Sequence, residues 1–209
     1  MGGWGIKRLE NLSTILVTKL RWHLITSHIL WTKVATSKYI APQSLMDWLW
    51  QPQWNSVGIS IIWKVVLQSM SLIQDGLTWR IRSGALVRIG VDPWIKCVNA
   101  HRIPDELKTH LTAMGITHIS HIVDRENSTF TQQAWKSGHA LQIPQPWQQY
   151  WKEYTDALIE SHIRILEGED EIIWAPTKHG WYSPREGYLV LMDSKKPPIV
   201  NPGGAVYES

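Results

Sequence analysis

The segment 77–95 constrains the fold more than any other part of the chain. Apolar residues alternate with arginines in two short stretches, 79–82 and 87–89, which a Ser-Gly-Ala tripeptide joins. Alternation with a period of two is typical of half-buried strands, and Gly84 can adopt the positive φ of a tight turn. The sequence therefore predicts a β-hairpin with one apolar face. The other face carries three arginines, Arg80, Arg82 and Arg88.

The second predicted strand ends at Asp92-Pro93, because proline has no N–H for a ladder and restricts the residue before it. Trp94, which follows, is expected to fold back onto the hairpin and to fill the space beneath it.

Amphipathic helices are predicted before this segment. Residues 58–74 carry the clearest apolar stripe, in steps of three and four that place one helix face against a core. Its members are Ile59, Ile62, Trp63, Val66, Leu67, Met70 and Ile73. A helix that begins at about Leu9 has a similar stripe, formed by Leu9, Leu12, Leu16 and Leu20 with Ile15 beside it. Another helix is expected over 30–39, and an ordered loop over 47–54.

In the second half, proline, glycine and acidic residues mark the expected boundaries. A helix is predicted from Pro104, with two acids in its first turn, to Gly115. Further helices are predicted over 131–139 and 146–160. The latter has an apolar stripe formed by Trp147, Trp151, Tyr154 and Leu158.

A second hairpin is predicted to pair residues 172–174 with 181–182 through a turn at 176–180. Ser183-Pro184-Arg185-Glu186 then has the pattern of a capping box with proline at the first helical position. It predicts a helix that runs to Met192. With the helices above, these patterns predict a mainly α fold with two small β-hairpins (α+β).

Three blocks of the chain resemble the region that follows the polymerase core in reverse transcriptases of plant non-LTR retrotransposons. The first, Gly-Gly-Trp-Gly-Ile-Lys-Arg-Leu near the start, is similar to the family's Gly-Gly-Leu-Gly-Ile-Arg-x-Leu. The second is Trp-Arg-Ile-x-Ser-Gly, then Val-Arg-Ile and Asp-Pro-Trp-Ile, where the family has Trp-Arg-Ile-Gly-Asn-Gly and Asp-Pro-Trp-Leu. The third, residues 171–188, is similar to the block that leads into the family's zinc-binding-like domain.

The resemblance implies a truncated fragment of a larger polyprotein, in which Met1 is an internal methionine. It implies a helical thumb- or connection-like segment at 1–76. A hairpin–helix region at 77–192 would lead into a truncated zinc-binding-like domain. Residues 193–209, rich in proline and glycine, are expected to form a disordered tail.

No catalytic residue is predicted. Polymerisation needs paired carboxylates that hold two divalent ions, and the sequence contains no Asp-Asp pair. In the family, the polymerase carboxylates lie upstream of the matching region and the RNase H carboxylates lie downstream. We therefore expect no activity from the chain alone. A role as one part of an RNA-directed DNA polymerase assembled in trans is an alternative.

No metal site or cofactor is predicted either. Cys97, His101, His118 and His121 have a spacing that suits a tetrahedral zinc, but nine histidines make such spacings common by chance. The lone cysteine excludes an intramolecular disulfide and fits a reducing compartment, so an intracellular location in the nucleus or cytoplasm is expected. Lys64 interrupts the longest apolar run, and no membrane partner is expected.

Charge is divided unevenly along the chain. Residues 1–104 contain 12 Lys/Arg and 4 Asp/Glu, a net charge of +8, and residues 105–209 have a net charge of −5. A basic half favours a polyanionic partner, so weak binding to RNA or DNA without sequence preference is predicted. The candidate contacts are Lys7, Arg8, Lys19, Arg21, Arg80, Arg82 and Arg88. A helical protein-interaction module without a nucleic-acid role is the alternative.

Overall fold

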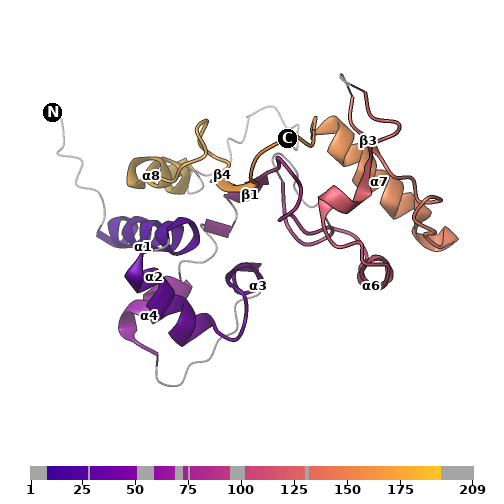
Figure 1. Cartoon of the computed structure of the whole chain (residues 1–209). Coiled ribbons are helices and arrows are strands. Elements are labelled where there is room, and N and C mark those ends of the chain that lie inside the picture. Colours follow the sequence, from indigo (N-terminus) through magenta and orange to yellow (C-terminus); the bar gives the residue numbers. More distant parts are fainter. Residues whose placement is uncertain are drawn as a thin grey trace, which may run out of the picture. The chain divides into compact units, whose positions relative to one another are not determined.

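The computed structural model describes residues 9–27, 29–50, 59–68, 73–74, 76–94, 102–129 and 132–193. The chain divides into two compact units, unit 1 (Met1–Asp75 with Tyr182–Ser209) and unit 2 (Gly76–Trp181). Helices predominate, and two small antiparallel sheets accompany them (Figure 1). The predicted fold class, mainly α with small β elements, is confirmed.

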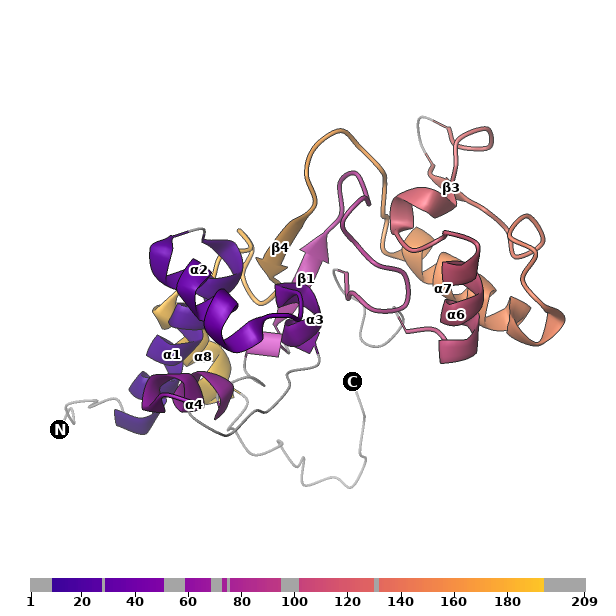
Figure 2. The same cartoon turned by 60° about the horizontal axis from the view of Figure 1, so that its bottom comes forward.

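Unit 1 is a group of helices. They are α1 (Leu9–Thr26), α2 (Leu30–Ala35), the π-helix η1 (Thr36–Ile40), α3 (Leu45–Trp50), α4 (Ile61–Gln68) and α8 (Pro184–Asp193). Within this unit α1 contacts α2, α4 and α8, and both views show α8 beside α1 (Figure 2). The predicted region 77–192 is therefore divided between the two units, because α8, at its end, packs on α1.

Two members of the predicted leucine stripe of α1, Leu16 and Leu20, do not face the core, and for these residues the sequence prediction is wrong. Leu16 is 56% exposed and Leu20 is 41% exposed. The buried face instead carries Asn11, Ile15, Thr18 and Trp22, in steps of four, three and four. Both sets have helical spacing, and the contacts with α4 and α8 decide which of them is buried.

Two local predictions in unit 1 are confirmed in the described residues. Ser183 and Glu186 form the capping box at the start of α8: the Ser183 hydroxyl lies 2.7 Å from Glu186 Oε2, and the Glu186 N–H donates to it. On α4, Trp63, Val66 and Leu67 are buried as the stripe predicts. Ile62, predicted in the same stripe, is 70% exposed, and Met70 lies outside the described residues.

Residues 47–50, part of the ordered loop predicted over 47–54, belong instead to the helix α3 (Leu45–Trp50). The Ser44 hydroxyl accepts a hydrogen bond from the Asp47 N–H, which caps the first turn of that helix. Residues 51–54 of the same prediction lie outside the described part of the chain.

Unit 2 is built around a sheet of two strands, β1 (Leu77–Arg80) and β4 (Glu171–Trp174), which pair antiparallel from Leu77–Trp174 to Arg80–Glu171. Neither predicted hairpin forms. β1 pairs with β4 rather than with residues 87–89, and β4 pairs with β1 rather than with residues 181–182. Residues 87–89 lie against 117–119 instead, where Ile89 and Ile119 donate backbone N–H groups to Thr117 and Val87.

The carboxylate of Asp170 explains why residues 82–86 do not form a hairpin turn. Its Oδ1 accepts N–H bonds from Arg82 (2.7 Å) and Gly84 (2.9 Å), and its Oδ2 accepts the Leu86 N–H (2.9 Å). The Ser83 hydroxyl lies 3.3 Å from Oδ2. We call residues 82–86 the Asp170 loop. Gly84 has the predicted positive φ, +68°, but uses it to wrap this carboxylate.

Trp94 and the helices α6 and α7 contribute buried residues to unit 2. As predicted, Trp94 is buried, and it lies edge-on to Tyr154 with ring centroids 5.1 Å apart. α6 (Asp105–Ala113) matches its predicted bounds, with Gly115 at φ +73° after its end. The predicted helix at 146–160 is also present, as the 3₁₀ turn η3 (Gln145–Trp147) followed by α7 (Gln148–Glu160). Of its predicted apolar stripe, Trp151, Tyr154 and Leu158 are buried.

The helix predicted at 131–139 does not form in the described residues. Instead β3 (Ala134–Trp135) pairs with β2 (Val123–Asp124), which follows the 3₁₀ turn η2 (Ile119–Ile122). The Lys136 N–H donates to the Ile122 carbonyl, so this backbone is used for strand pairing and not for a helix. No helix among the described residues combines the length and apolarity that a bilayer crossing requires.

Candidate nucleic-acid interface

Of the seven cations predicted from the sequence, the structure describes five, and these are exposed, buried or paired with a carboxylate. Lys7 and Arg8 lie outside the described residues, and Lys19 is exposed on α1. Arg21 is only 1% exposed, and its guanidinium has no hydrogen-bond partner among the described residues. Burial lowers the pKa of Arg21 to about 9. A side chain buried in this way is withdrawn from phosphate contact, so the assignment of Arg21 to the interface is wrong.

The three arginines of segment 77–95 do not form the free basic face that the sequence predicts. Arg80 Nη1 lies 3.2 Å from Glu171 Oε2, on the strand paired with its own. Arg88 donates from Nε and Nη2 to the carboxylate of Asp92, at 3.0 and 2.9 Å, and the Asp92 side chain is 1% exposed. Two of the three charges are thus balanced by carboxylates.

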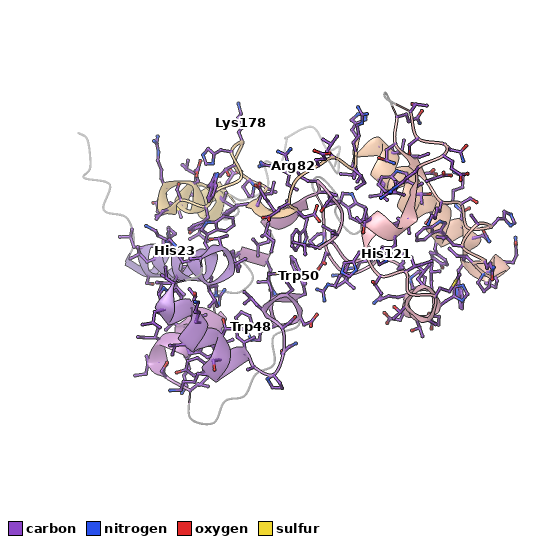
Figure 3. All side chains as sticks on the ribbon, in the orientation of Figure 1. His23, Trp48, Trp50, Arg82, His121 and Lys178 are labelled. Atoms are coloured by element: carbon purple, nitrogen blue, oxygen red, sulfur yellow. The ribbon has the colours of Figure 1, made fainter. Side chains whose placement is uncertain are left out.

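Arg82 is the exposed member of that set. Figure 3 labels it on the Asp170 loop, where its backbone N–H is held by the carboxylate while its side chain is open to solvent. Of the seven predicted residues, the structure therefore leaves Lys19, in unit 1, and Arg82, in unit 2, exposed and described.

A stack of aromatic rings in unit 1 was not predicted as a site. Trp48 of α3 and Trp63 of α4 are buried, with ring centroids 5.5 Å apart and planes 30° from parallel. Tyr39 of η1 stacks on Trp63 at 4.6 Å and 14°, and remains partly exposed. Figure 3 labels Trp48 at the α3 end of this stack. The three rings form one column whose outer member, Tyr39, reaches the surface.

Basic groups accompany the outer ring of this column. The Lys38 ammonium lies 5.2 Å from the centroid of the Tyr39 ring, a cation–π distance. The Tyr39 hydroxyl donates to the Ser60 hydroxyl at 3.3 Å, which fixes the ring from its far end. The ionised Tyr39 oxygen can instead accept a hydrogen bond from the Ser60 hydroxyl, and this interaction, with the charge of Lys38 as a further cause, lowers the pKa of Tyr39.

Four lysines of unit 1 are exposed and have no carboxylate partner among the described residues. They are Lys19, Lys33, Lys38 and Lys64. Unit 1 as a whole contains 10 Lys/Arg and 6 Asp/Glu, a net charge of +4, whereas unit 2 has a net charge of −1. The positive charge of the chain is therefore concentrated in the unit that presents the aromatic column.

The sequence contained a signal for this arrangement. Lys38 and Tyr39 are adjacent, as are Trp63 and Lys64, so basic and aromatic residues stand side by side on two segments. The assignment of Trp63 to a helix core is correct, but only the tertiary structure brings Tyr39 onto its ring.

The histidines that the zinc spacing singled out are only partly described. His118 and His121 lie with ring centroids 5.6 Å apart, and Cys97 and His101 fall outside the described residues. Burial, and secondarily the charge of His121, lowers the pKa of His118. In the described part of the chain, no three His, Cys, Asp or Glu side chains converge in an arrangement that could hold a metal ion.

The chain was compared with known proteins by family, by sequence and by structure. No family model matches it, and neither a curated protein nor a solved structure matches it.

Proposed function

We propose that the chain is a non-catalytic fragment of a retrotransposon reverse transcriptase polyprotein, of the plant non-LTR kind. We further propose that it binds single-stranded RNA or DNA weakly and without sequence preference. The origin is supported by three sequence blocks in consistent order. Two of them contain β1 and β4, the paired strands of unit 2.

One observation carries the binding proposal: the Tyr39 ring is partly exposed, stacks on a buried tryptophan and has the Lys38 ammonium 5.2 Å from its centroid. Every base has a face that can stack on such a ring, and lysines beside it can contact phosphates without reading base edges. The exposed lysines of unit 1, which have no carboxylate partner in the described part of the chain, supply further phosphate contacts. The interface is thus assigned chiefly to Lys19, Lys33, Lys38, Tyr39 and Lys64, with Arg82 as the remaining exposed candidate of unit 2.

Replacing the four exposed lysines of unit 1 with glutamine is expected to weaken binding and flatten its salt dependence. Each phosphate contact on a single strand contributes about 0.7 to the slope of log K against log salt concentration. The slope should therefore flatten by up to about 2.8. Fluorescence anisotropy with a labelled oligo(dT), measured at several salt concentrations, gives both quantities.

Two further variants separate charge from stacking. Tyr39→Leu should lower affinity at every salt concentration while leaving the slope unchanged, because it removes a ring and no charge. Lys152→Gln with Lys178→Gln, at two exposed lysines of unit 2, is the matched control and should change neither quantity. If the four-lysine variant, still folded by circular dichroism, keeps the wild-type affinity and slope, the binding proposal is wrong.

The purified chain is expected to show no polymerase or nuclease activity with Mg²⁺ or Mn²⁺. The reason is chemical: two-metal phosphoryl transfer needs paired carboxylates, and the sequence has no Asp-Asp pair. Primer-extension and nuclease assays of the purified chain measure this directly. Activity that co-elutes with the chain and persists through repeated purification would contradict it. Activity gained only when a separate palm fragment is added would favour assembly in trans.

A helical protein-interaction module is the second candidate function. Its support is the apolar surface that unit 1 exposes on several helices: Leu30 is 78% exposed, Ile61 is 80% exposed, and Leu16 and Leu20 of α1 are also exposed. A protein partner whose binding is insensitive to salt, together with no affinity for oligonucleotides, would favour this function over the first.

A further inference from the structure

Unit 2 contains a cavity of about 320 Å³, whose lining shares no residue with the aromatic column of unit 1. Three segments form its walls: the turn at 88–91, α6, and the loop at 116–118 (Figure 2 shows α6). Its volume falls at the lower end of the range for small-molecule sites.

Backbone hydrogen bonds hold these walls together. The Ile89 N–H donates to the Thr117 carbonyl at 3.0 Å, and the Ile116 N–H donates to the Leu111 carbonyl at 2.9 Å. Arg88 and His118 are paired by an isolated antiparallel bridge. The cavity is therefore formed by ordered backbone before any ligand enters, which lowers the entropic cost of binding.

One part of the lining is apolar. It consists of Ile89, Val91, Leu111 and Ile116, of which Ile89 and Leu111 are buried. Such a surface favours a ligand with an apolar body, since that body would leave water on binding.

The remaining lining residues are polar and include two cations. They are Arg88, Lys108, Thr112, Thr117 and His118, with no carboxylate side chain among them. Asp92 fixes the Arg88 guanidinium by contacts from Nε and Nη2, so that group is pre-oriented. Lys108 contacts Asp105, whose side chain is 90% exposed, and an exchangeable surface pair of this kind can release its ammonium to a ligand.

His118 adds an uncharged polar group to the same wall. Its Nδ1 lies 2.9 Å from the Thr117 hydroxyl. Burial lowers the pKa of His118 and so favours the neutral imidazole, and the Thr117 hydroxyl and this imidazole can serve a ligand oxygen as hydrogen-bond partners.

We propose that this cavity binds a small amphipathic anion, an apolar or aromatic body that carries one phosphate or carboxylate group. The body lies against the apolar wall, and the anionic group lies beside Lys108, with the Arg88 guanidinium, whose charge Asp92 balances, as a further hydrogen-bonding group of the lining. The proposal is independent of nucleic-acid binding by unit 1, because the two involve different residues in different units.

The test is a ¹⁵N NMR titration of the full chain with four probes: phenyl phosphate, benzoate, benzyl alcohol and inorganic phosphate. Phenyl phosphate or benzoate is expected to shift the amide resonances of Ile89, Thr117 and His118, and to bind at least about tenfold more tightly than the other two probes. The better of the two aromatic anions identifies the preferred headgroup. Equal affinity for benzyl alcohol, or shifts confined to other residues, would overturn the proposal.

Variants locate the two halves of the site. Lys108→Gln should lower the affinity for the preferred aromatic anion about tenfold. Val91→Thr should lower that affinity several-fold, because it makes the apolar wall polar at nearly constant volume. The matched control is Lys152→Gln on α7. Lys152 forms a surface ion pair with Asp156, as Lys108 does with Asp105, but it does not line the cavity. If Lys108→Gln binds like wild type while its resonances remain dispersed, the cavity is not an anion site.

Discussion

Replacing Asp170 with asparagine is expected to destabilise unit 2 by about 3 kcal/mol or more. The reason is that a neutral amide cannot accept all the backbone N–H bonds that the buried carboxylate accepts. The Asp170 residue is 6% exposed and its carboxylate accepts three backbone N–H bonds from the Asp170 loop. An asparagine amide can present an oxygen to only one side, so its NH₂ group would face N–H donors on the other. Urea unfolding gives the free energy, and amide hydrogen exchange at residues 82–86 gives the local effect.

The pKa of the Asp170 carboxyl also determines how its contribution to the stability of unit 2 should depend on pH. Burial by itself would raise the pKa of Asp170, but hydrogen bonds from Leu86, Arg82, Gly84 and Ser83 outweigh burial and hold it below its ordinary value. A carboxyl whose pKa is depressed in the folded state stabilises that state at pH values above its unfolded pKa, about 4. The difference in unfolding free energy between wild type and the asparagine variant should therefore shrink as pH falls below about 4.

Asp156→Asn is the control for this variant. Asp156 is paired with Lys152 on the exposed side of α7, where water screens the interaction, so the unfolding free energy should hardly change. If asparagine at position 170 also leaves stability and exchange at the Asp170 loop unchanged, the carboxylate does not hold that loop.

Replacing Trp63 with alanine is expected to destabilise unit 1 by roughly 3–5 kcal/mol, the usual cost of removing a buried tryptophan. Trp63 is 5% exposed and is the middle ring of the column, between Trp48 and Tyr39. Its loss would leave a cavity and remove two ring contacts. Urea unfolding followed by far-ultraviolet circular dichroism avoids the change in tryptophan fluorescence.

Ile62→Ala is the matched control on the same helix. Ile62 precedes Trp63 but is 70% exposed, so its truncation should change the unfolding free energy by less than about 0.5 kcal/mol. A loss below about 1 kcal/mol for Trp63→Ala would mean that α4 does not bury this face. Such a result would also mean that Trp63 does not support the Tyr39 ring, on which the proposed binding surface depends.

The sequence by itself determined features that are encoded within one turn of chain. Pro104, the acids that follow it and Gly115 place α6 correctly, and Ser183 with Glu186 places the start of α8. Gly84 has the positive φ that its position suggested. Such features follow from φ preferences and from hydrogen bonds between residues three or four positions apart, which act in any tertiary setting.

Only the tertiary structure decided which strands pair. Residues 79–82 and 87–89 are suited to a hairpin, yet β1 takes its partner from β4, with Arg80 and Glu171 separated by 91 positions. The Asp170 carboxylate, distant in sequence, takes the N–H groups of the connecting loop. No local pattern reveals such a competitor, because alternating residues describe a strand without specifying its neighbour.

Tertiary contacts also decided which helix faces are buried, and with them the candidate site. On α1 the leucine stripe and the face containing Ile15 and Trp22 are both periodic; the second is buried, whereas Leu16 and Leu20 of the first are exposed. The same choice buries Arg21 and leaves Lys19 exposed. Periodicity identifies the candidate faces of a helix, but burial depends on which neighbouring helices cover them, and that is a property of the whole unit.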